Sequence, residues 1–303
     1  MNNLADNKNG FIECYDIGGT NIRAAFIVEG KIEEPFINEK TEKNNVGSFV
    51  QQIKRVSSSL RKAHPEISIN NIQAASLAFP GPVEGTRLLG SKPLEFDEEI
   101  DFSCLLGDYF NVPLIVGNDL NMASQGELAL GQFKEIKNFC LVTISTGIGV
   151  GVIMNGSLYN RQTEIGHIVL ETNPDLANPC LGHKGCWAAQ ASGVGIEKTV
   201  EKMGRKLTAE EIFEDPEYKE IVDKVKQYNA YGIGNLINAY DPEKIIIMGS
   251  LGLKQFNKII PDPEIIKQYT LLNNIPEIVP TALGESIGLF GAYFSAKNFL
   301  EAD

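Results

Sequence analysis

The stretch FIECYDIGGTNIRAAFIVE, residues 11–29, sets a glycine turn between two apolar segments. We expect strands over 11–16 and 24–29, joined through Gly18-Gly19-Thr20-Asn21. Such a turn can be a plain tight hairpin, or it can bind phosphate, because glycines let the oxygens approach closely and their amides donate hydrogen bonds. In the second case Thr20 adds a hydroxyl, and Asp16, at the end of its strand, can hold a magnesium ion.

A second turn of similar composition lies in the other half of the chain. Ser145-Thr146-Gly147-Ile148-Gly149 follows an apolar strand expected over 138–145 and leads into another at 152–154. It is neither a Walker loop nor a dinucleotide fingerprint, because the chain has no G-x-x-x-x-G-K-[ST] and these glycines run G-x-G-x-G. The repetition predicts two related α/β domains, with phosphates held across a cleft between them.

The remaining hydrophobic periodicity supplies the other elements. We expect strands at 72–79, 113–116 and 244–248, and helices at 46–64, 102–110, 120–130, 221–240 and 285–300. Thr208-Ala209-Glu210-Glu211 has the form of a helix capping box. The predicted division is a disordered tail at 1–10, an N-terminal domain at 11–117 and a C-terminal domain at 118–286, with a last helix at about 287–303 that packs back on the first domain.

Composition limits the class of protein. The chain has 303 residues, enough for two domains, and its net charge of −12 disfavours nucleic acid or an anionic membrane as the main partner. The polar start, MNNLADNKNG, does not resemble a signal peptide, and no run of about twenty apolar residues predicts a membrane span. An odd number of cysteines without a secretory signal indicates a reducing cytoplasm.

Histidine and cysteine gather in one segment, 164–187. His167, Cys180, His183 and Cys186 are spaced H-x12-C-x2-H-x2-C in a chain with only three histidines and five cysteines. Two imidazoles and two thiolates suit a closed tetrahedral zinc site. The alternatives are inert buried thiols and a disulfide between Cys180 and Cys186, which a reducing compartment disfavours. Because a closed metal site does no chemistry itself, we expect it to hold other groups in place.

Asp119 lies where the strand at 113–116 gives way to the helix at 120–130. Open α/β sheets place their ligands at the carboxyl ends of strands, and a carboxylate there can accept a proton from an attacking hydroxyl. The alternative is that Asp119 is only the N-cap of the helix, a position where Asp is a preferred residue. Spacing alone favours the cap.

Together these segments resemble the ROK family of repressors and sugar kinases, with matching order and spacing from about residue 11 to residue 296. The resemblance is carried by Asp16-Ile-Gly-Gly-Thr-Asn21, Pro80-Gly-Pro-Val83, Gly117-Asn-Asp-Leu-Asn-Met-Ala123, Thr146-Gly-Ile-Gly-Val-Gly151, Glu164-Ile-Gly-His167 and Ile245-Ile-Ile-Met-Gly249. It implies an α/β, two-domain fold of the actin-like, hexokinase type (ribonuclease H-like) with an interdomain cleft. It also implies ATP-dependent phosphorylation of a hexose hydroxyl.

The resemblance further implies a role for each matched residue. Asp119 would be the general base, and the sugar would be bound by Gly81, Asn118, Asp119, Glu164 and His167. The phosphates of ATP and their Mg²⁺ would be held by Asp16, Gly18, Gly19, Thr20, Asn21, Thr146 and Gly147, with Gly249 and Ser250 beside the adenosine. A structural Zn²⁺ would bind His167, Cys180, His183 and Cys186, with His183 as the replacement ligand that ROK fructokinases use.

The chain departs from the family pattern beside this cluster. The usual zinc motif is C-x-C-x4-C, and most family kinases carry a sugar-binding Glu at the position of Ala188. The resemblance therefore favours glucose as the substrate but keeps fructose, mannose and N-acetylmannosamine as alternatives.

Two other classes of function are weighed against a kinase. A regulator of this family carries a winged helix-turn-helix domain before the first glycine turn, and the residues before Asp16 are too few for one. A non-catalytic sugar-binding protein is favoured only by Ala188. We therefore expect a cytoplasmic kinase that binds a sugar and ATP but neither nucleic acid nor membrane, and that forms homodimers or homotetramers.

Overall fold

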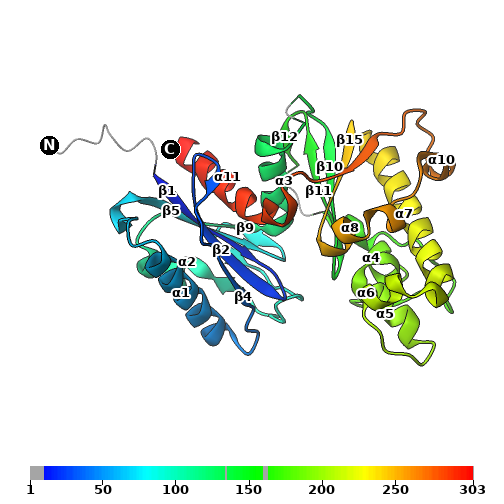
Figure 1. Ribbon diagram of the computed structural model, residues 1–303, viewed down its shortest axis with the longest axis horizontal. Coiled ribbons are helices and arrows are strands. Elements are labelled where there is room, and N and C mark those ends of the chain that lie inside the picture. Colours follow the sequence, from blue (N-terminus) through cyan, green and yellow to red (C-terminus); the bar gives the residue numbers. More distant parts are fainter. Residues whose placement is uncertain (1–9, 134, 160–162, 303) are drawn as a thin grey trace. The chain divides into compact units, whose positions relative to one another are not determined.

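A computed structural model describes residues 10–133, 135–159 and 163–302 of the chain (Figure 1). The predicted tail at 1–10 lies outside these residues, apart from Gly10. The chain forms two compact units: unit 1 comprises Met1–Gln132 and Ser286–Asp303, and unit 2 comprises Phe133–Glu285. The first division falls after Gln132 rather than after residue 117, because helix α3 (Asp119–Leu130) packs against helix α11 (Ile287–Ala302).

Unit 1 is built on a mixed sheet in the order β3-β2-β1-β5-β9, in which β4 also pairs with β2. β1 and β2 form an antiparallel hairpin, whereas β1, β5 and β9 run parallel. Asp16 pairs with Ala78 and Asn118 pairs with Phe79, so the ends of all three parallel strands meet at one edge. The strands are β1 (Phe11–Ile17), β2 (Asn21–Val28), β3 (Lys31–Ile32), β4 (Ile37–Lys40), β5 (Ile72–Phe79) and β9 (Leu114–Asn118).

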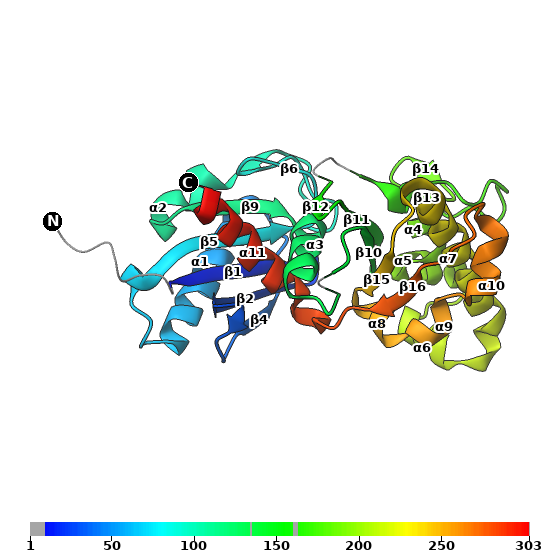
Figure 2. The same ribbon diagram turned by 90° about the horizontal axis from the view of Figure 1, so that it is seen from above.

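Helices α1 (Val46–Ala63) and α2 (Phe102–Phe110) cover one face of this sheet, and α3 and α11 cover the other (Figures 1 and 2). Side chains of β1 alternate between the two faces, with Tyr15 in the core beneath α1 and Cys14 in the core beneath α11. The same alternation directs Asp16 toward the α11 face. The helix predicted at 46–64 is confirmed as α1, and it buries an apolar stripe of Phe49, Ile53, Val56 and Leu60.

A small three-stranded sheet lies between β5 and α2 along the chain. It consists of β6 (Val83–Glu84), β7 (Arg87–Leu88) and β8 (Ile100–Asp101). The loop between β7 and β8 contains Gly90 and Pro93, which approach two of the glycines singled out in the sequence.

Unit 2 repeats the hairpin-plus-parallel-strand topology in a sheet ordered β12-β11-β10-β15-β16. β10 and β11 form the antiparallel hairpin, and β15 and β16 extend the sheet in parallel with β10. β11 begins at Ile148, so the prediction that Gly149 and Gly151 belong to the turn is wrong: they pair with Thr143 and Leu141. The strands are β10 (Phe139–Ile144), β11 (Ile148–Met154), β12 (Ser157–Leu158), β15 (Lys244–Met248) and β16 (Glu277–Pro280).

The helices of unit 2 pack around one large core in which Trp187 is fully buried and donates from Nε1 to Asn229 Oδ1 at 2.8 Å. The predicted capping box is confirmed, with Thr208 and Glu211 bonded reciprocally. The helices are α4 (Trp187–Ala191), α5 (Gly193–Glu201), α6 (Ala209–Glu214), α7 (Lys219–Tyr240), α8 (Ser250–Lys254), α9 (Phe256–Ile259) and α10 (Pro263–Ile266).

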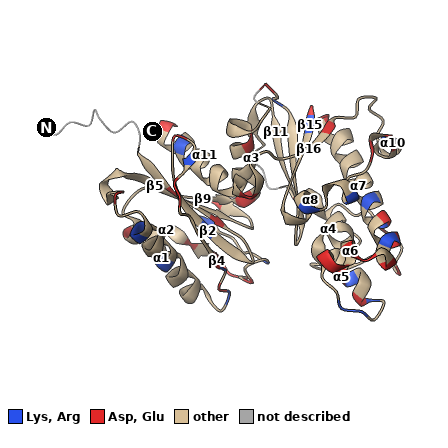
Figure 3. Ribbon diagram, viewed as in Figure 1, with Lys and Arg blue, Asp and Glu red and all other residues tan. Residues whose placement is uncertain are grey.

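Charged residues of both signs lie along the surface helices, as Figure 3 shows for α7. Within the described part of the chain, no helix has the length and apolar character needed to cross a membrane.

Candidate active site

Asp16 lies at the sheet edge of unit 1, next to the Arg23 side chain and helix α11. Its Oδ2 is 3.9 Å from Nη1 of Arg23, which is its partner residue on β2. Burial raises the pKa of Asp16 above its usual value, and the Arg23 guanidinium opposes that rise. A Cβ at Gly288, in the first turn of α11, would lie 2.4 Å from Asp16 Cγ. Gly288, which the sequence reasoning missed, therefore makes room for the Asp16 carboxylate.

The turn after Asp16 differs from a plain two-residue hairpin. Gly18 N donates to Asn21 O at 2.8 Å, but Gly18, Gly19 and Thr20 all lack the positive φ that type I′ and II′ turns require. Gly19 is needed for space instead, because a Cβ there would lie 2.6 Å from Pro93 O. Thr20 is exposed. The turn thus presents a hydroxyl to solvent and is not a two-residue type I′ or II′ hairpin turn.

Asn118 caps helix α3, so the interpretation of Asp119 as the cap is wrong. Asn118 Oδ1 accepts from Asn121 N at 3.0 Å, and Asp119 is the first residue of the helix. Asp119 Oδ1 accepts from Leu120 N at 2.8 Å and from Asn118 Nδ2 at 3.2 Å. These bonds fix the Asp119 carboxylate at the carboxyl end of β9.

Asn118 also contacts Gly81, which the resemblance assigns to the sugar site. Asn118 Nδ2 donates to Gly81 O at 3.0 Å. Gly81 has φ +144°, and a Cβ there would lie 2.4 Å from Gly90 O, so only glycine fits. Asn118 therefore joins Gly81 to Asp119, and both amide hydrogens of its side chain are engaged within unit 1.

The second glycine turn borders a pocket of about 220 Å³ in unit 2. Its wall includes Thr146 and Ser250, two of the residues that the resemblance assigns to ATP. The remaining lining residues are Ser145, Gly193, Val194, Glu197, Ala209, Glu210, Leu251, Lys254 and Gln255. A Cβ at Gly147 would meet open space. Gly249 has φ +87°, and a Cβ there would lie 2.6 Å from Ile144 O.

Two features of this pocket were outside the sequence prediction. Gly193 N, at the start of α5, donates to Ser145 O at 2.8 Å and so fixes the turn to that helix. Lys254 and Glu210 form an ion pair at 2.5 Å on the wall, and Glu197 Oε1 accepts from Ala209 N at 3.0 Å. The signal for these residues was weak, because charged side chains on short helices are common on any surface.

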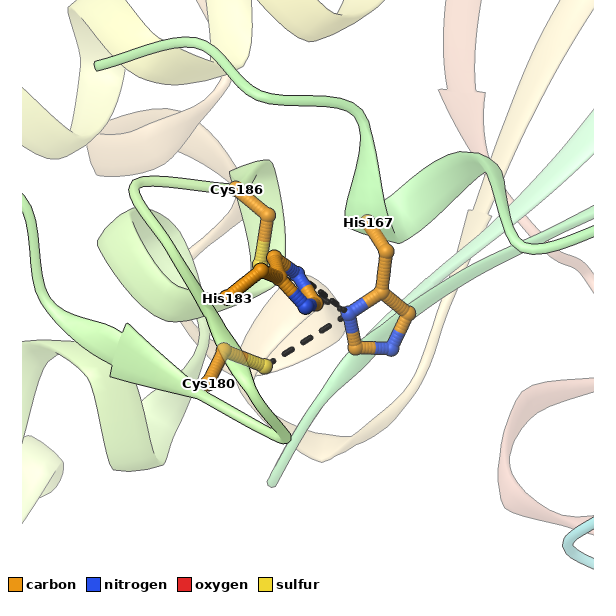
Figure 4. A group of neighbouring side chains, drawn as sticks. All are labelled: His167, Cys180, His183 and Cys186. Carbon is orange, nitrogen blue, oxygen red and sulfur yellow. Dashed lines mark hydrogen bonds between the residues drawn. The ribbon is translucent and has the colours of Figure 1, made fainter. Parts of the chain in front are cut away.

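The four predicted zinc ligands converge (Figure 4). Their ligand atoms all lie within 4.8 Å of one another. His167 Nδ1 is 3.4 Å from His183 Nε2, 3.5 Å from Cys180 Sγ and 3.6 Å from Cys186 Sγ. With Zn–N of about 2.05 Å and Zn–S of about 2.3 Å, a tetrahedral ion places two nitrogens about 3.3 Å apart and a nitrogen and sulfur about 3.6 Å apart. The three separations from His167 Nδ1 match edges of that tetrahedron.

Local backbone builds this cluster. Cys180 and His183 pair across the β13 (Pro179–Cys180) and β14 (His183–Lys184) hairpin, whose tip uses Leu181 and Gly182 at positive φ. Burial, and then the neighbouring Cys186, raises the pKa of Cys180 to about 11. Without a cation the Cys180 thiol therefore stays protonated at neutral pH, whereas a bound divalent ion would favour the thiolate.

His167 presents its other nitrogen away from the cluster. Its Nε2 lies 3.9 Å from Glu164 Oε2, and the Glu164 side chain is exposed. Ala188, two residues after Cys186, is buried in α4 and offers no polar group. Glu164 is thus a polar group beside the ring nitrogen of His167 that faces away from the cluster.

A comparison with protein families identifies the chain. The model of the ROK family matches residues 12–298. The chain belongs to the ROK family. Its resemblance to that family is confirmed over nearly the whole sequence.

Known members of the ROK family include both regulators and kinases. The chain is 26% identical over 227 residues to the xylose repressor of Bacillus spizizenii, covering 71% of this chain and 58% of the repressor. It is 28% identical over 317 residues to the glucokinase of Halalkalibacterium halodurans, covering 93% of this chain and 94% of the glucokinase. The chain therefore spans little more than half the length of the repressor but nearly all of the glucokinase.

A solved structure shows the same fold. The ROK glucokinase of Streptomyces griseus, in complex with glucose and AMPPNP, matches with a TM-score of 0.80 at 20% identity, covering 95% of this chain and 100% of that one. This ROK protein has the predicted actin-like, hexokinase-type α/β fold.

Proposed function

We propose that this ROK protein is an ATP-dependent sugar kinase that phosphorylates a hexose hydroxyl, with glucose as the first candidate. The observation that carries the proposal is the placement of Asp16 and Asp119 at one edge of the mixed sheet, where the parallel strands β1 and β9 flank β5. One carboxylate suits a magnesium–phosphate group and the other suits an attacking hydroxyl. The glucokinase relative, matched over 94% of its length, supports this assignment.

The proposed base is Asp119. Hydrogen bonds from Leu120 N and Asn118 Nδ2 hold its Oδ1, so the carboxylate is oriented before the sugar arrives. It would take the proton of the sugar hydroxyl as that oxygen attacks the γ-phosphorus and ADP leaves. Phosphoryl transfer needs mainly positioning and charge neutralisation, which a fixed carboxylate and a preformed turn supply.

Each unit would supply its own nucleotide contacts beside its glycine turn. Asp16 and the turn at 18–21 would hold Mg²⁺ and phosphate oxygens, and the Asp16 carboxylate fits the one or two carboxylates that Mg²⁺ usually takes beside phosphates. The pocket of unit 2, between Thr146 and Ser250, would take the adenosine.

The proposed zinc site is structural. The separations of the other three donor atoms from His167 Nδ1 fit a tetrahedral ion, and four protein ligands leave no position for chemistry. With Nδ1 of His167 as the ligand, its Nε2 keeps the proton and can donate to a sugar hydroxyl, while Glu164 accepts from a neighbouring one. Both residues would thereby recognise vicinal hydroxyls.

Substrate choice is best tested on a panel of sugars. ADP release should be measured with Mg·ATP and glucose, fructose, mannose or N-acetylmannosamine, because Ala188 removes an acid that family kinases use for this recognition. We expect turnover on at least one hexose, with glucose leading. Absence of turnover on all four sugars, in protein that binds Mg·ATP, would instead favour the non-catalytic sugar-binding alternative.

A further inference from the structure

We propose that Thr41 is a positioning residue for the turn at Gly18–Asn21, an inference that rests on the proposed phosphate-binding function of that turn. Thr41 directly follows β4. Its Oγ1 donates to Gly18 O at 2.7 Å, and its N donates to Thr20 O at 2.9 Å. One residue thus binds two of the turn's carbonyl groups.

These two bonds decide which way the turn's amide groups face. In a planar trans peptide the carbonyl and the following N–H point in opposite directions. With Gly18 O held by Thr41, the N–H of Gly19 faces away from β4. An anion that takes hydrogen bonds from this turn needs N–H groups, not carbonyls, on its own side. The Thr41 hydroxyl therefore holds the turn in the orientation that suits a phosphate.

Thr41 is itself held in place by helix α1. Gln52, which is 1% exposed, donates from Nε2 to Lys40 O at 2.7 Å and accepts at Oε1 from Glu42 N at 2.8 Å. These bonds fix the residues on both sides of Thr41. Pro93 contacts the turn at Gly19, where a Cβ would meet Pro93 O. The turn is therefore supported by two separate segments of unit 1.

The test compares Thr41→Val, which keeps the shape of the side chain but removes the hydroxyl, with Thr41→Ser, which keeps the hydroxyl. The readout is the Kd of Mg·ATP by calorimetry, which does not depend on the identity of the sugar. Loss of this part-buried neutral hydrogen bond should weaken binding about tenfold in the Val variant. The Ser variant should stay within about twofold of the wild type. Thr86→Val is the matched control, because its hydroxyl donates to Asp101 Oδ1 at 3.0 Å, away from the turn.

The outcomes distinguish the role of Thr41 from the proposed phosphate-binding role of the turn. Gly19→Ala should also weaken Mg·ATP binding, since its methyl group meets Pro93. If Gly19→Ala weakens binding but both Thr41 variants bind like the wild type, the role of Thr41 is refuted. If Gly19→Ala binds Mg·ATP normally, the phosphate role of the turn is refuted as well. Equal losses in Thr41→Val and Thr41→Ser would show that the hydroxyl does not act, and would also overturn the proposal.

Discussion

Asp16 has its position because Gly288 lacks a side chain. The two residues lie far apart in sequence, yet a methyl group at 288 would meet the carboxylate carbon at 2.4 Å. Ordinary contacts between carbon atoms are longer by more than an ångström, so a side chain at 288 must displace either the carboxylate or helix α11. The cost of such a substitution would fall on the group proposed to hold Mg²⁺.

Gly288→Ala should therefore impair the proposed kinase activity more than it impairs the fold. We expect kcat/KM for Mg·ATP to fall about tenfold or more, because a misplaced group of this kind has large kinetic effects. Gly107→Ala is the control, since Gly107 lies in α2 with nothing within 4 Å of its Cβ position. Equal activity in the two variants would contradict the proposed role of Gly288.

Zinc binding is predicted to couple to protonation. Because burial and Cys186 raise the pKa of Cys180 to about 11, uptake of zinc by metal-free protein should release protons, and affinity should fall as the pH is lowered. Metal analysis should give about one zinc per chain in the wild type, and His183→Ala should lose it together with thermal stability. A wild type that is fully active and stable without metal would refute the site.

Helices α3 and α11 cross with their backbones close together. A Cβ at Gly126 would lie 2.8 Å from Gly291 N, and one at Gly291 would lie 2.3 Å from the backbone carbon of Met122. Asp119 is the first residue of α3, and Gly288, which makes room for Asp16, lies in the first turn of α11. The close crossing of the two helices therefore influences the distance between the Asp16 and Asp119 carboxylates. It also explains why α3 belongs to unit 1.

Gly126→Ala should destabilise unit 1. Overpacking a close backbone contact costs about 1–3 kcal/mol, whereas Gly107→Ala should raise stability by up to about 1 kcal/mol because alanine is the better helix former. Urea unfolding, followed by a signal from unit 1, gives the change in the free energy of unfolding for both variants. A Gly126→Ala protein as stable as the wild type would mean that the two helices can separate without cost.

The elements with local signals were predictable, and those fixed by distant contacts were not. The helix at 46–64 and the H-x12-C-x2-H-x2-C cluster depend on patterns among residues close in sequence, and both form as expected. Gly126, Gly288 and Gly291 act through contacts with remote backbone, so a single sequence gives no sign of them. The cap was misplaced by one residue because Asn118 and Asp119 are adjacent and Asn and Asp are equally good N-caps.

Across the whole molecule, the proposed chemistry is divided between two units of related topology. Each unit joins an antiparallel hairpin to parallel strands, and each hairpin turn carries one of the proposed phosphate contacts. The repeat was visible in the sequence because both turns keep their glycines. The exact division of the chain was not, because α3 joins the first unit through its packing against the distant helix α11.

Keeping Asp16 charged should cost the free protein stability. Burial raises its pKa above the unfolded value, so its contribution to folding is favourable at acid pH, below the unfolded pKa, and is lost as the pH rises through the raised folded pKa. Asp16→Asn should therefore raise the Tm at pH 7 without Mg·ATP, and this gain should shrink as the pH falls through the raised pKa. The same variant should bind Mg·ATP more weakly. A lower Tm at pH 7 would show that Arg23 outweighs burial.

Asp119 is proposed to be the base of a sugar kinase. The measurement is kcat for ADP release by wild type and Asp119→Asn at saturating Mg·ATP and the best hexose. The amide keeps an oxygen for Leu120 N but cannot take a proton, so kcat should fall by about 10²–10⁴-fold while the protein stays folded. An Asp119→Asn protein that turns over at the wild-type rate would show that Asp119 is not the base.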